Sequence, residues 1–295
     1  MLEKTKMKAT TLLLTLIISI TAFAQNAEKY TDSRGNVQLA GKIEVEDLAS
    51  KELGDWFQKG YSEEVFRDKS KWAKKLKKSE VEIYMGTWCG DSKKWVPRFV
   101  KLWDDLGLSR EQLKLYALYG GSERYKQGPN GEEKGLDIHR VPTFIFKEDG
   151  QEYARIVESP SSDLLTDVAQ IAFGYPSEPN YRGVTYLMRE LNENQADEVA
   201  FDFFEHKDNL RRILLGSSEL NTLGYVYLYS NRLEEALITF KLNSLLFPFE
   251  PRVHNSYGRA LEEKGALKLA GESYERALTL EPENQRAKDR LAALQ

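Results

Sequence analysis

Cys89 is the single cysteine of this 295-residue chain and the one side chain that could act as a sulfur nucleophile. It lies in the stretch GTWCGDSKKWVP, residues 86–97, with Trp88 before it and Ser92 three positions after it. A thiol at the start of a helix meets unpaired backbone N–H groups and the positive end of the helix dipole, and both favour the thiolate. Ser92 stands where a second cysteine would complete a dithiol pair, and its hydroxyl would donate a hydrogen bond to that thiolate. These residue types in this order predict thiol–disulfide chemistry.

The neighbours of Cys89 allow both a reactive and a structural interpretation. Trp88 would cover one side of the thiol, and Gly90 would let a partner backbone approach it. Asp91 stabilises a helix start but opposes the thiolate through like charge. Asp91 and Ser92 are also ordinary helix-start residues, and a lone cysteine is commonly a small buried hydrophobic residue. Because Cys89 directly follows an expected strand, we favour reactivity and keep a structural cysteine as the alternative.

The elements that must position Cys89 follow from apolar spacing and turn residues. The expected strands are 81–85, 112–119, 141–146 and 151–157, and the expected helices are 43–58, 63–77, 91–106 and 161–173. Asp149-Gly150 would form the tight turn of a hairpin between the last two strands. Residues 25–41 are polar and are expected to be loosely held, and the glycine-rich segment 120–136 is expected to be a surface loop.

Two prolines complete the pattern around the cysteine. Pro97 lies inside the expected helix, eight residues after Cys89, and Pro142 opens an expected strand, where a cis peptide bond is one explanation. Together with the Trp88-Cys89-Gly90 stretch and the hairpin, these prolines resemble the thioredoxin fold over about residues 42–175. The resemblance implies an α/β domain with a central mixed sheet flanked by helices.

The resemblance also implies roles for individual residues. Cys89, Ser92 and Pro142 would be the catalytic residues. The residues that contact the client would be Trp88, Gly90, Asp91, Val141 and Thr143. Val141 would offer its backbone groups to an extended client chain.

Two departures from the thioredoxin pattern limit the implied chemistry. Ile83 stands where the family has a buried acidic residue, and the adjacent Glu82 should point to the other face of the strand. The second cysteine, which would resolve a mixed disulfide, is replaced by Ser92. The implied reaction is therefore monothiol exchange, in which another thiol must release the client from Cys89.

The second half of the chain contains a repeat with a period of 34 residues. The recurring pairs are Leu223-Gly224 with Tyr257-Gly258, Ala236 with Ala270, Phe240 with Tyr274, and Pro248 with Pro282. Small residues let two helices cross closely, the aromatic ring fills the groove, and the proline ends the second helix. The pattern resembles tetratricopeptide repeats at 217–250 and 251–284, although Asn243 replaces a small residue. The implied organisation is a helical domain at 181–295 that ends in a capping helix and binds a protein partner.

The N-terminus predicts export. Residues 1–24 combine lysines with a short apolar run and then Ala22-Phe23-Ala24, which is typical of a secretory signal peptide. We therefore expect a periplasmic or secreted protein with no stable membrane span after cleavage. With one cysteine, any disulfide in that oxidising compartment must be intermolecular.

Charge and composition disfavour other functions. The formal net charge of −4 and the pI of about 5.7 do not indicate a nucleic-acid surface. The three histidines and one cysteine have no metal-ligand spacing, and we expect no metal or cofactor. His139 is expected to be a loop residue near the site and not a base. The peroxiredoxin pattern is absent, which disfavours a thiol peroxidase.

The leading hypothesis is an exported monothiol exchanger that acts on a client protein or a small thiol or disulfide. The alternative is a non-catalytic protein-binding scaffold in which Cys89 is structural.

Overall fold

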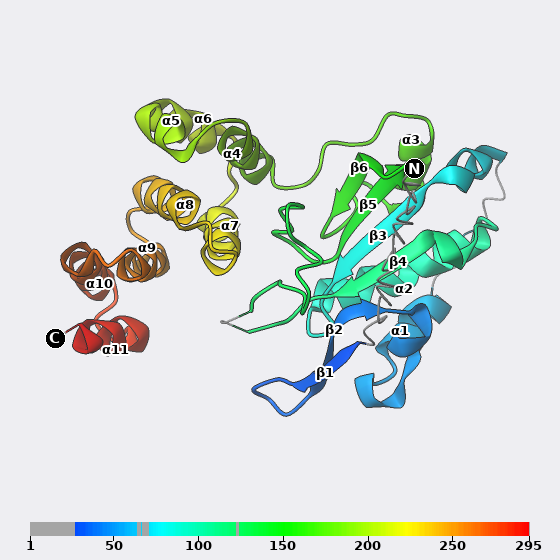
Figure 1. Ribbon diagram of the computed structural model, residues 1–295, viewed down its shortest axis with the longest axis horizontal. Coiled ribbons are helices and arrows are strands. Elements are labelled where there is room, and N and C mark those ends of the chain that lie inside the picture. The colour runs from blue at the N-terminus through cyan, green and yellow to red at the C-terminus, as the bar shows by residue number, and fades with distance from the viewer. Residues whose placement is uncertain (1–26, 64–65, 67–70, 122–123, 295) are drawn as a thin grey trace, which may run out of the picture.

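A six-stranded mixed sheet forms the N-terminal half of the structure, and helices form the C-terminal half (Figure 1). The computed structural model describes residues 27–294 apart from 64–65, 67–70 and 122–123. The strand order in the sheet is β1-β2-β4-β3-β5-β6. The strands are β1 Glu28–Thr31, β2 Val37–Ile43, β3 Glu80–Met85, β4 Leu113–Ala117, β5 Thr143–Glu148 and β6 Gln151–Val157.

The centre of the sheet is a β3–α2–β4 unit. β3 and β4 pair in parallel, with Val81 opposite Leu113, because helix α2, Gly90–Asp105, returns the chain to the edge where β3 began. β5 pairs with the other side of β3 in the antiparallel sense. The Asp149-Gly150 turn, with positive φ at both residues, then brings β6 back beside β5 as the sequence predicts.

The main core lies between the sheet and helices α1, Trp56–Glu63, α2, and α3, Leu164–Ala172. The ring centroids of Phe99 and Trp103 on α2 are 5.6 Å apart, and the Phe99 ring lies 4.4 Å from that of Phe144 on β5. Close packing of these large rings fixes α2 against the sheet. The N-terminus of α2, where the cysteine lies, is thereby fixed as well.

The segment 25–41, expected to be loosely held, instead supplies two strands. β2 pairs antiparallel with β4, and Leu39 and Ala40 are buried. The Asp32 carboxylate accepts hydrogen bonds from the backbone N–H groups of Arg34 and Asn36, which closes the turn between β1 and β2. The polar composition of the segment obscured the strands because this turn and the exposed β1 supply most of its polar residues.

The two helices expected before β3 are shorter and partly of the 3-10 type. The range 43–58 contains 3-10 turns at Val45–Ala49 and Lys51–Leu53 and then the start of α1. Ser50 has an extended conformation and interrupts the helical run. The range 63–77 ends in a 3-10 helix at Lys71–Lys78, and residues 64–65 and 67–70 lie outside the described chain. Apolar residues at helical spacing suit 3-10 turns nearly as well as an α-helix over such short distances.

The helical half is a series of antiparallel pairs. Its helices are α4 Arg182–Glu193, α5 Ala196–Phe201, α6 Phe203–Ile213, α7 Ser217–Tyr229, α8 Leu233–Leu246, α9 Pro251–Glu263, α10 Leu267–Leu280 and α11 Gln285–Ala293. A Cβ on Gly224 would lie 2.5 Å from the Phe240 ring, and one on Gly258 would lie 2.6 Å from the Tyr274 ring. Each glycine therefore admits the aromatic ring of the following helix, as the repeat pattern predicts. Asn243 fits because its side-chain amide donates to the carbonyl of Ser217.

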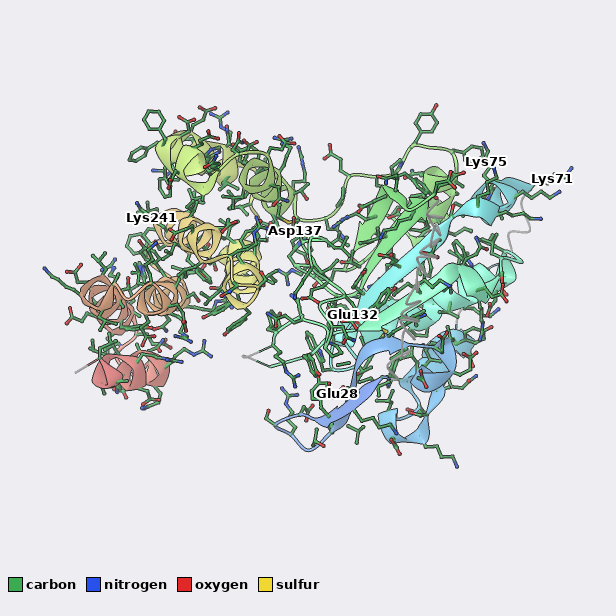
Figure 2. All side chains as sticks on the ribbon, viewed as in Figure 1. Glu28, Lys71, Lys75, Glu132, Asp137 and Lys241 are labelled. Carbon is green, nitrogen blue, oxygen red and sulfur yellow. The ribbon has the colours of Figure 1, made fainter. Side chains whose placement is uncertain are left out.

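The two halves meet at the segment between β4 and β5. Figure 1 shows helices α4 to α11 as an arc beside the sheet, with this segment reaching toward α7. Asp137, labelled in Figure 2, lies at the junction and its carboxylate is 3.1 Å from the Arg232 guanidinium. The Gln127 side chain donates to the backbone carbonyl of Tyr229. In the part of the chain that the structure describes, no helix is long and apolar enough to cross a membrane.

Candidate functional site around Cys89

Cys89 lies at the junction of β3 and α2. A turn after Met85 is closed by a hydrogen bond from the Cys89 backbone N–H to the Gly86 carbonyl, 2.9 Å. Cys89 is the N-cap of α2, and its half-buried thiol donates to the backbone carbonyl of Val141 at 3.2 Å. The sulfur therefore lies next to the first turn of a helix, where free N–H groups stabilise negative charge.

Thr87 fixes this turn to a distant strand. Its buried hydroxyl accepts a hydrogen bond from the Leu39 backbone N–H at 3.0 Å and donates to the Gln38 side chain at 2.8 Å. Both partners belong to β2, the strand that sequence analysis missed. The position of Cys89 thus depends on β2 as well as on β3.

The Trp88 ring lies between two glycines. A Cβ on Gly86 would come within 2.6 Å of the ring and one on Gly120 within 2.8 Å, so neither position accepts a larger residue without movement. The indole N–H donates to the Leu118 carbonyl at 2.8 Å, and the ring centroid lies 5.9 Å from that of Tyr125. Trp88 therefore forms a wall beside the cysteine and connects it to the segment after β4.

The loop before β5 packs against the thiol. The Val141–Pro142 peptide bond is cis, as the sequence suggests, and the Thr143 hydroxyl donates to the Arg140 carbonyl at 2.7 Å. Val141 is 2% exposed and Thr143 is 1% exposed, so neither offers an accessible side chain to a client in this structure. Of the expected client-contacting residues, Gly90 and Asp91 are exposed, and Trp88 is half-buried.

The expected hydrogen bond from Ser92 to the cysteine sulfur is not formed. Ser92 is fully buried, and its hydroxyl oxygen accepts from the Gly86 backbone N–H at 3.1 Å. The thiol of Cys89 turns instead to Val141. Ser92 therefore stabilises the turn that presents Cys89.

The strand beneath the cysteine places its side chains as the sequence predicts. Ile83 is buried in the main core. Glu82 lies on the other face, where its carboxylate is 2.7 Å from the Lys147 ammonium and accepts a hydrogen bond from the Tyr84 hydroxyl at 3.0 Å. The buried position beneath the cysteine, Ile83, therefore carries no carboxylate.

A buried lysine that sequence analysis missed lies beside the site. Lys126 is 4% exposed, and its ammonium donates to the His139 backbone carbonyl. Burial lowers the pKa of Lys126 to about 7, and Arg140 also lowers it, while a negative charge on Cys89 acts in the opposite direction. Lys126 also has a left-handed φ of 59°, a conformation that is costly for a residue other than glycine. Its one sequence signal was its place in a long polar loop.

An ion pair and a neutral histidine complete the surroundings. The Arg140 guanidinium lies 3.5 Å from the Glu158 carboxylate. The pKa of Glu158 is raised, chiefly by burial and further by Asp91, although Arg140 acts in the opposite direction. Burial, Lys126 and Arg140 lower the pKa of His139 to about 3, so its ring is neutral at pH 7 and is a weak base.

Lys126 is a basic side chain near Cys89 that could exchange a proton at neutral pH. An amine whose pKa lies near 7 can both accept and donate a proton at neutral pH. Among the described residues, no group of three or more His, Cys, Asp or Glu side chains could hold a metal ion.

Comparison with known proteins bears on the helical half. The model of the tetratricopeptide repeat family matches residues 251–284, the bounds predicted for the second repeat, and this prediction is confirmed. For residues 217–250, the support is the equivalent packing of Gly224 against Phe240. No curated protein matched the chain. A tetratricopeptide repeat implies protein–protein interaction, so the repeat at 251–284 supports a protein partner for this chain.

Proposed function

We propose that this protein is an exported, thioredoxin-like protein that exchanges disulfides through the single thiol of Cys89. The observation that supports this most strongly is the position of the sulfur, at the N-cap of α2 and 3.2 Å from the carbonyl that precedes the cis proline. The β3–α2–β4 unit, the β5–β6 hairpin and α3 follow in the order that the family resemblance implies. The export signal at 1–24 lies outside the described residues, so export rests on the sequence.

The proposed reaction begins with a proton transfer. The neutral Lys126 amine takes the proton of the Cys89 thiol, and the resulting ammonium and the N-terminus of α2 stabilise the thiolate. The thiolate attacks one sulfur of a client disulfide. One S–S bond forms, another breaks, and the departing client thiolate takes the proton from Lys126.

Release of the client needs a second thiol. Because Ser92 replaces the resolving cysteine, a thiol of the client or a small thiol must attack the mixed disulfide and regenerate Cys89. Such a cycle suits an isomerase-like helper or a protein that retains its client. The tetratricopeptide region would hold the client during the exchange.

Mixed-disulfide formation with glutathione disulfide tests the proposal. We expect the native chain to gain one glutathionyl group by mass spectrometry, and to do so about tenfold faster than the same chain in denaturant. The Cys89→Ser variant is the negative control. A thiol that reacts only after unfolding would instead support the protein-binding scaffold with a structural cysteine.

A further inference from the structure

The linker between the sheet and the helical half, residues 175–180, ends beside the cysteine site. Its last residue, Asn180, and the following Tyr181, the N-cap of α4, both contact segments that surround the thiol. The resemblance to the thioredoxin fold ends at about residue 175, so it assigns these two residues no role.

Tyr181 packs against the loop before β5, residues 137–142, which carries the Val141 carbonyl that accepts a hydrogen bond from the thiol. The central carbon of the Arg140 guanidinium lies 4.5 Å from the centre of the Tyr181 ring, and the His139 ring meets that ring edge-on with the centroids 5.8 Å apart. A guanidinium is attracted to the face of an aromatic ring, and more strongly where water is excluded. The Arg140 side chain is only 18% exposed, so this contact fixes the residue directly before Val141.

Asn180 holds the other side of the same loop through the turn after β6. Its side-chain amide donates to the backbone carbonyl of Ser159 at 2.9 Å. The neighbouring Glu158 donates its backbone N–H to the Pro142 carbonyl at 2.7 Å, and its carboxylate pairs with Arg140. The loop before β5 is therefore held on two sides by two consecutive residues of the chain.

Backbone strain occurs at the same contacts. Among the described residues, six other than glycine have a positive φ, and Tyr181 at 70° and Glu158 at 64° are two of them. Large residues seldom adopt this left-handed conformation, which persists only where the surrounding contacts hold it. In both residues the side chain lies against Arg140. A tyrosine that only joined two domains would gain nothing from this conformation.

The loop before β5 connects these contacts to the reacting groups. The His139 carbonyl accepts from the Lys126 ammonium, and the Val141 carbonyl accepts from the Cys89 thiol. The proton acceptor and the sulfur of the proposed exchange are thus both bonded to the loop that Tyr181 packs against. A misplacement of about 1 Å at a reacting centre is enough to slow a reaction about a hundredfold.

We propose that Tyr181 is a positioning residue of the exchange site, which fixes the loop before β5 through Arg140 and so holds the sulfur and the lysine in their reactive arrangement. The inference rests on the exchange function proposed above. It means that a residue of the helical half completes the site around Cys89.

The rate at which glutathione disulfide modifies Cys89 in the full chain tests this role. Tyr181→Asn removes the ring but suits the left-handed backbone, and we expect its rate to be about tenfold below that of the native chain. Tyr181→Leu, which keeps apolar bulk, is a second variant without the ring and should be slowed equally. Circular dichroism checks that each variant is folded. A native rate in a folded variant without the ring would overturn the inference.

Two further variants are the controls for this measurement. Tyr181→Phe keeps the ring and should react within about twofold of the native chain. Tyr175→Leu removes a tyrosine of the same linker that is 78% exposed, and should leave the rate unchanged. A Phe variant as slow as the variants without the ring would show that the ring contact is not what positions the loop.

A double-mutant cycle tests whether Tyr181 acts through Arg140. Arg140→Met alone should also slow the reaction. The double variant Tyr181→Asn/Arg140→Met should be no slower than the slower single variant, because both changes remove the same contact. A native rate in Arg140→Met, or a double variant in which the two losses multiply, would refute the route through Arg140.

Amide hydrogen exchange separates the inference from the exchange function, because it does not depend on the thiol. The Glu158 amide, which bonds to Pro142, should exchange faster in Tyr181→Asn than in the native chain, and at the native rate in Tyr181→Phe. If both the modification rate and the amide exchange are native in Tyr181→Asn, the positioning role is overturned and thiol exchange stands. If the native thiol does not react with glutathione disulfide, thiol exchange is refuted, and with it the role of Tyr181 in that reaction, whatever the amide exchange shows.

Discussion

The repeats and the cysteine site both use glycine to admit an aromatic ring, but over different distances along the chain. In the helical half, Gly224 faces Phe240 and Gly258 faces Tyr274, and each pair lies within its own 34-residue unit. At the site, the Trp88 ring lies between Gly86 and Gly120, which belong to different segments. The repeats are therefore stabilised by contacts within each unit and with the neighbouring unit. The cysteine site forms only when four segments come together: β2, the turn between β3 and α2, the segment after β4, and the loop before β5. A change in a distant segment should disturb the site and leave the repeats intact, and a change in a repeat should do the reverse.

The largest effect that we expect comes from Phe240→Ala in the repeats. Phe240 is fully buried against Gly224, and removal of such a ring costs about 3–5 kcal/mol of unfolding free energy. Because the loss is confined to the helical half, the alkylation rate of Cys89 in the folded protein should be unchanged. Urea unfolding followed by circular dichroism measures the first effect, and mass spectrometry after brief iodoacetamide treatment measures the second. Leu269→Ala, at a half-exposed position on α10, is the control and should cost much less.

A smaller loss of stability with a larger effect on the site is expected for Gly120→Ala. The added methyl group would lie 2.8 Å from the rigid Trp88 ring, and overpacking of this kind costs about 1–3 kcal/mol. Displacement of Trp88 should also change the alkylation rate of Cys89. Gly216→Ala is the matched control, because its Cβ would meet no atom within 4 Å. If both variants alkylate at the native rate, Trp88 does not form a wall of the site.

The smallest effect concerns the pH dependence of stability. The folded pKa of Lys126 is about 7, below its ordinary value of 10.5, so between these pH values the unfolded chain binds more protons than the folded one. Stability therefore rises with pH in this window and is lost as the pH falls toward 7. Lys126→Met should flatten the rise between pH 7 and 9 by up to about 1.4 kcal/mol per pH unit. Urea titrations at several pH values measure the slope. An identical slope in the variant would show that Lys126 is not buried as an amine.

Local sequence signals predicted the features that depend on neighbouring residues. The apolar run before Gly86 and the helix-start residues after Cys89 placed β3 and α2 within one or two residues of their observed bounds. The 34-residue period gave the limits of the confirmed repeat at 251–284, because the Gly258–Tyr274 contact lies within the unit.

The features that the sequence did not predict depend on distant partners. Lys126 lies in a polar, glycine-rich loop, where a lysine is ordinarily solvated, and only the folded chain shows that it is buried against His139. The loop itself was expected to be surface, yet Gln127 bonds to the helical half at Tyr229. The predicted hydrogen bond from the Ser92 hydroxyl to the cysteine sulfur is not formed, because the Ser92 side chain is buried against the Gly86 N–H and the Cys89 thiol lies against the Val141 carbonyl.

The rate at which iodoacetamide alkylates Cys89 at pH 7 tests most directly whether the fold activates this thiol. The measurement compares the full native chain, the same chain in denaturant and the Lys126→Met variant. We expect the native thiol to react about tenfold faster than the denatured one, and the variant to lose most of that advantage, because Cys89 is the N-cap of α2 and Lys126 is the proton acceptor of the proposed reaction. A native thiol that reacts no faster than the denatured one, with no change in the variant, would mean that Cys89 is a structural residue of a protein-binding scaffold.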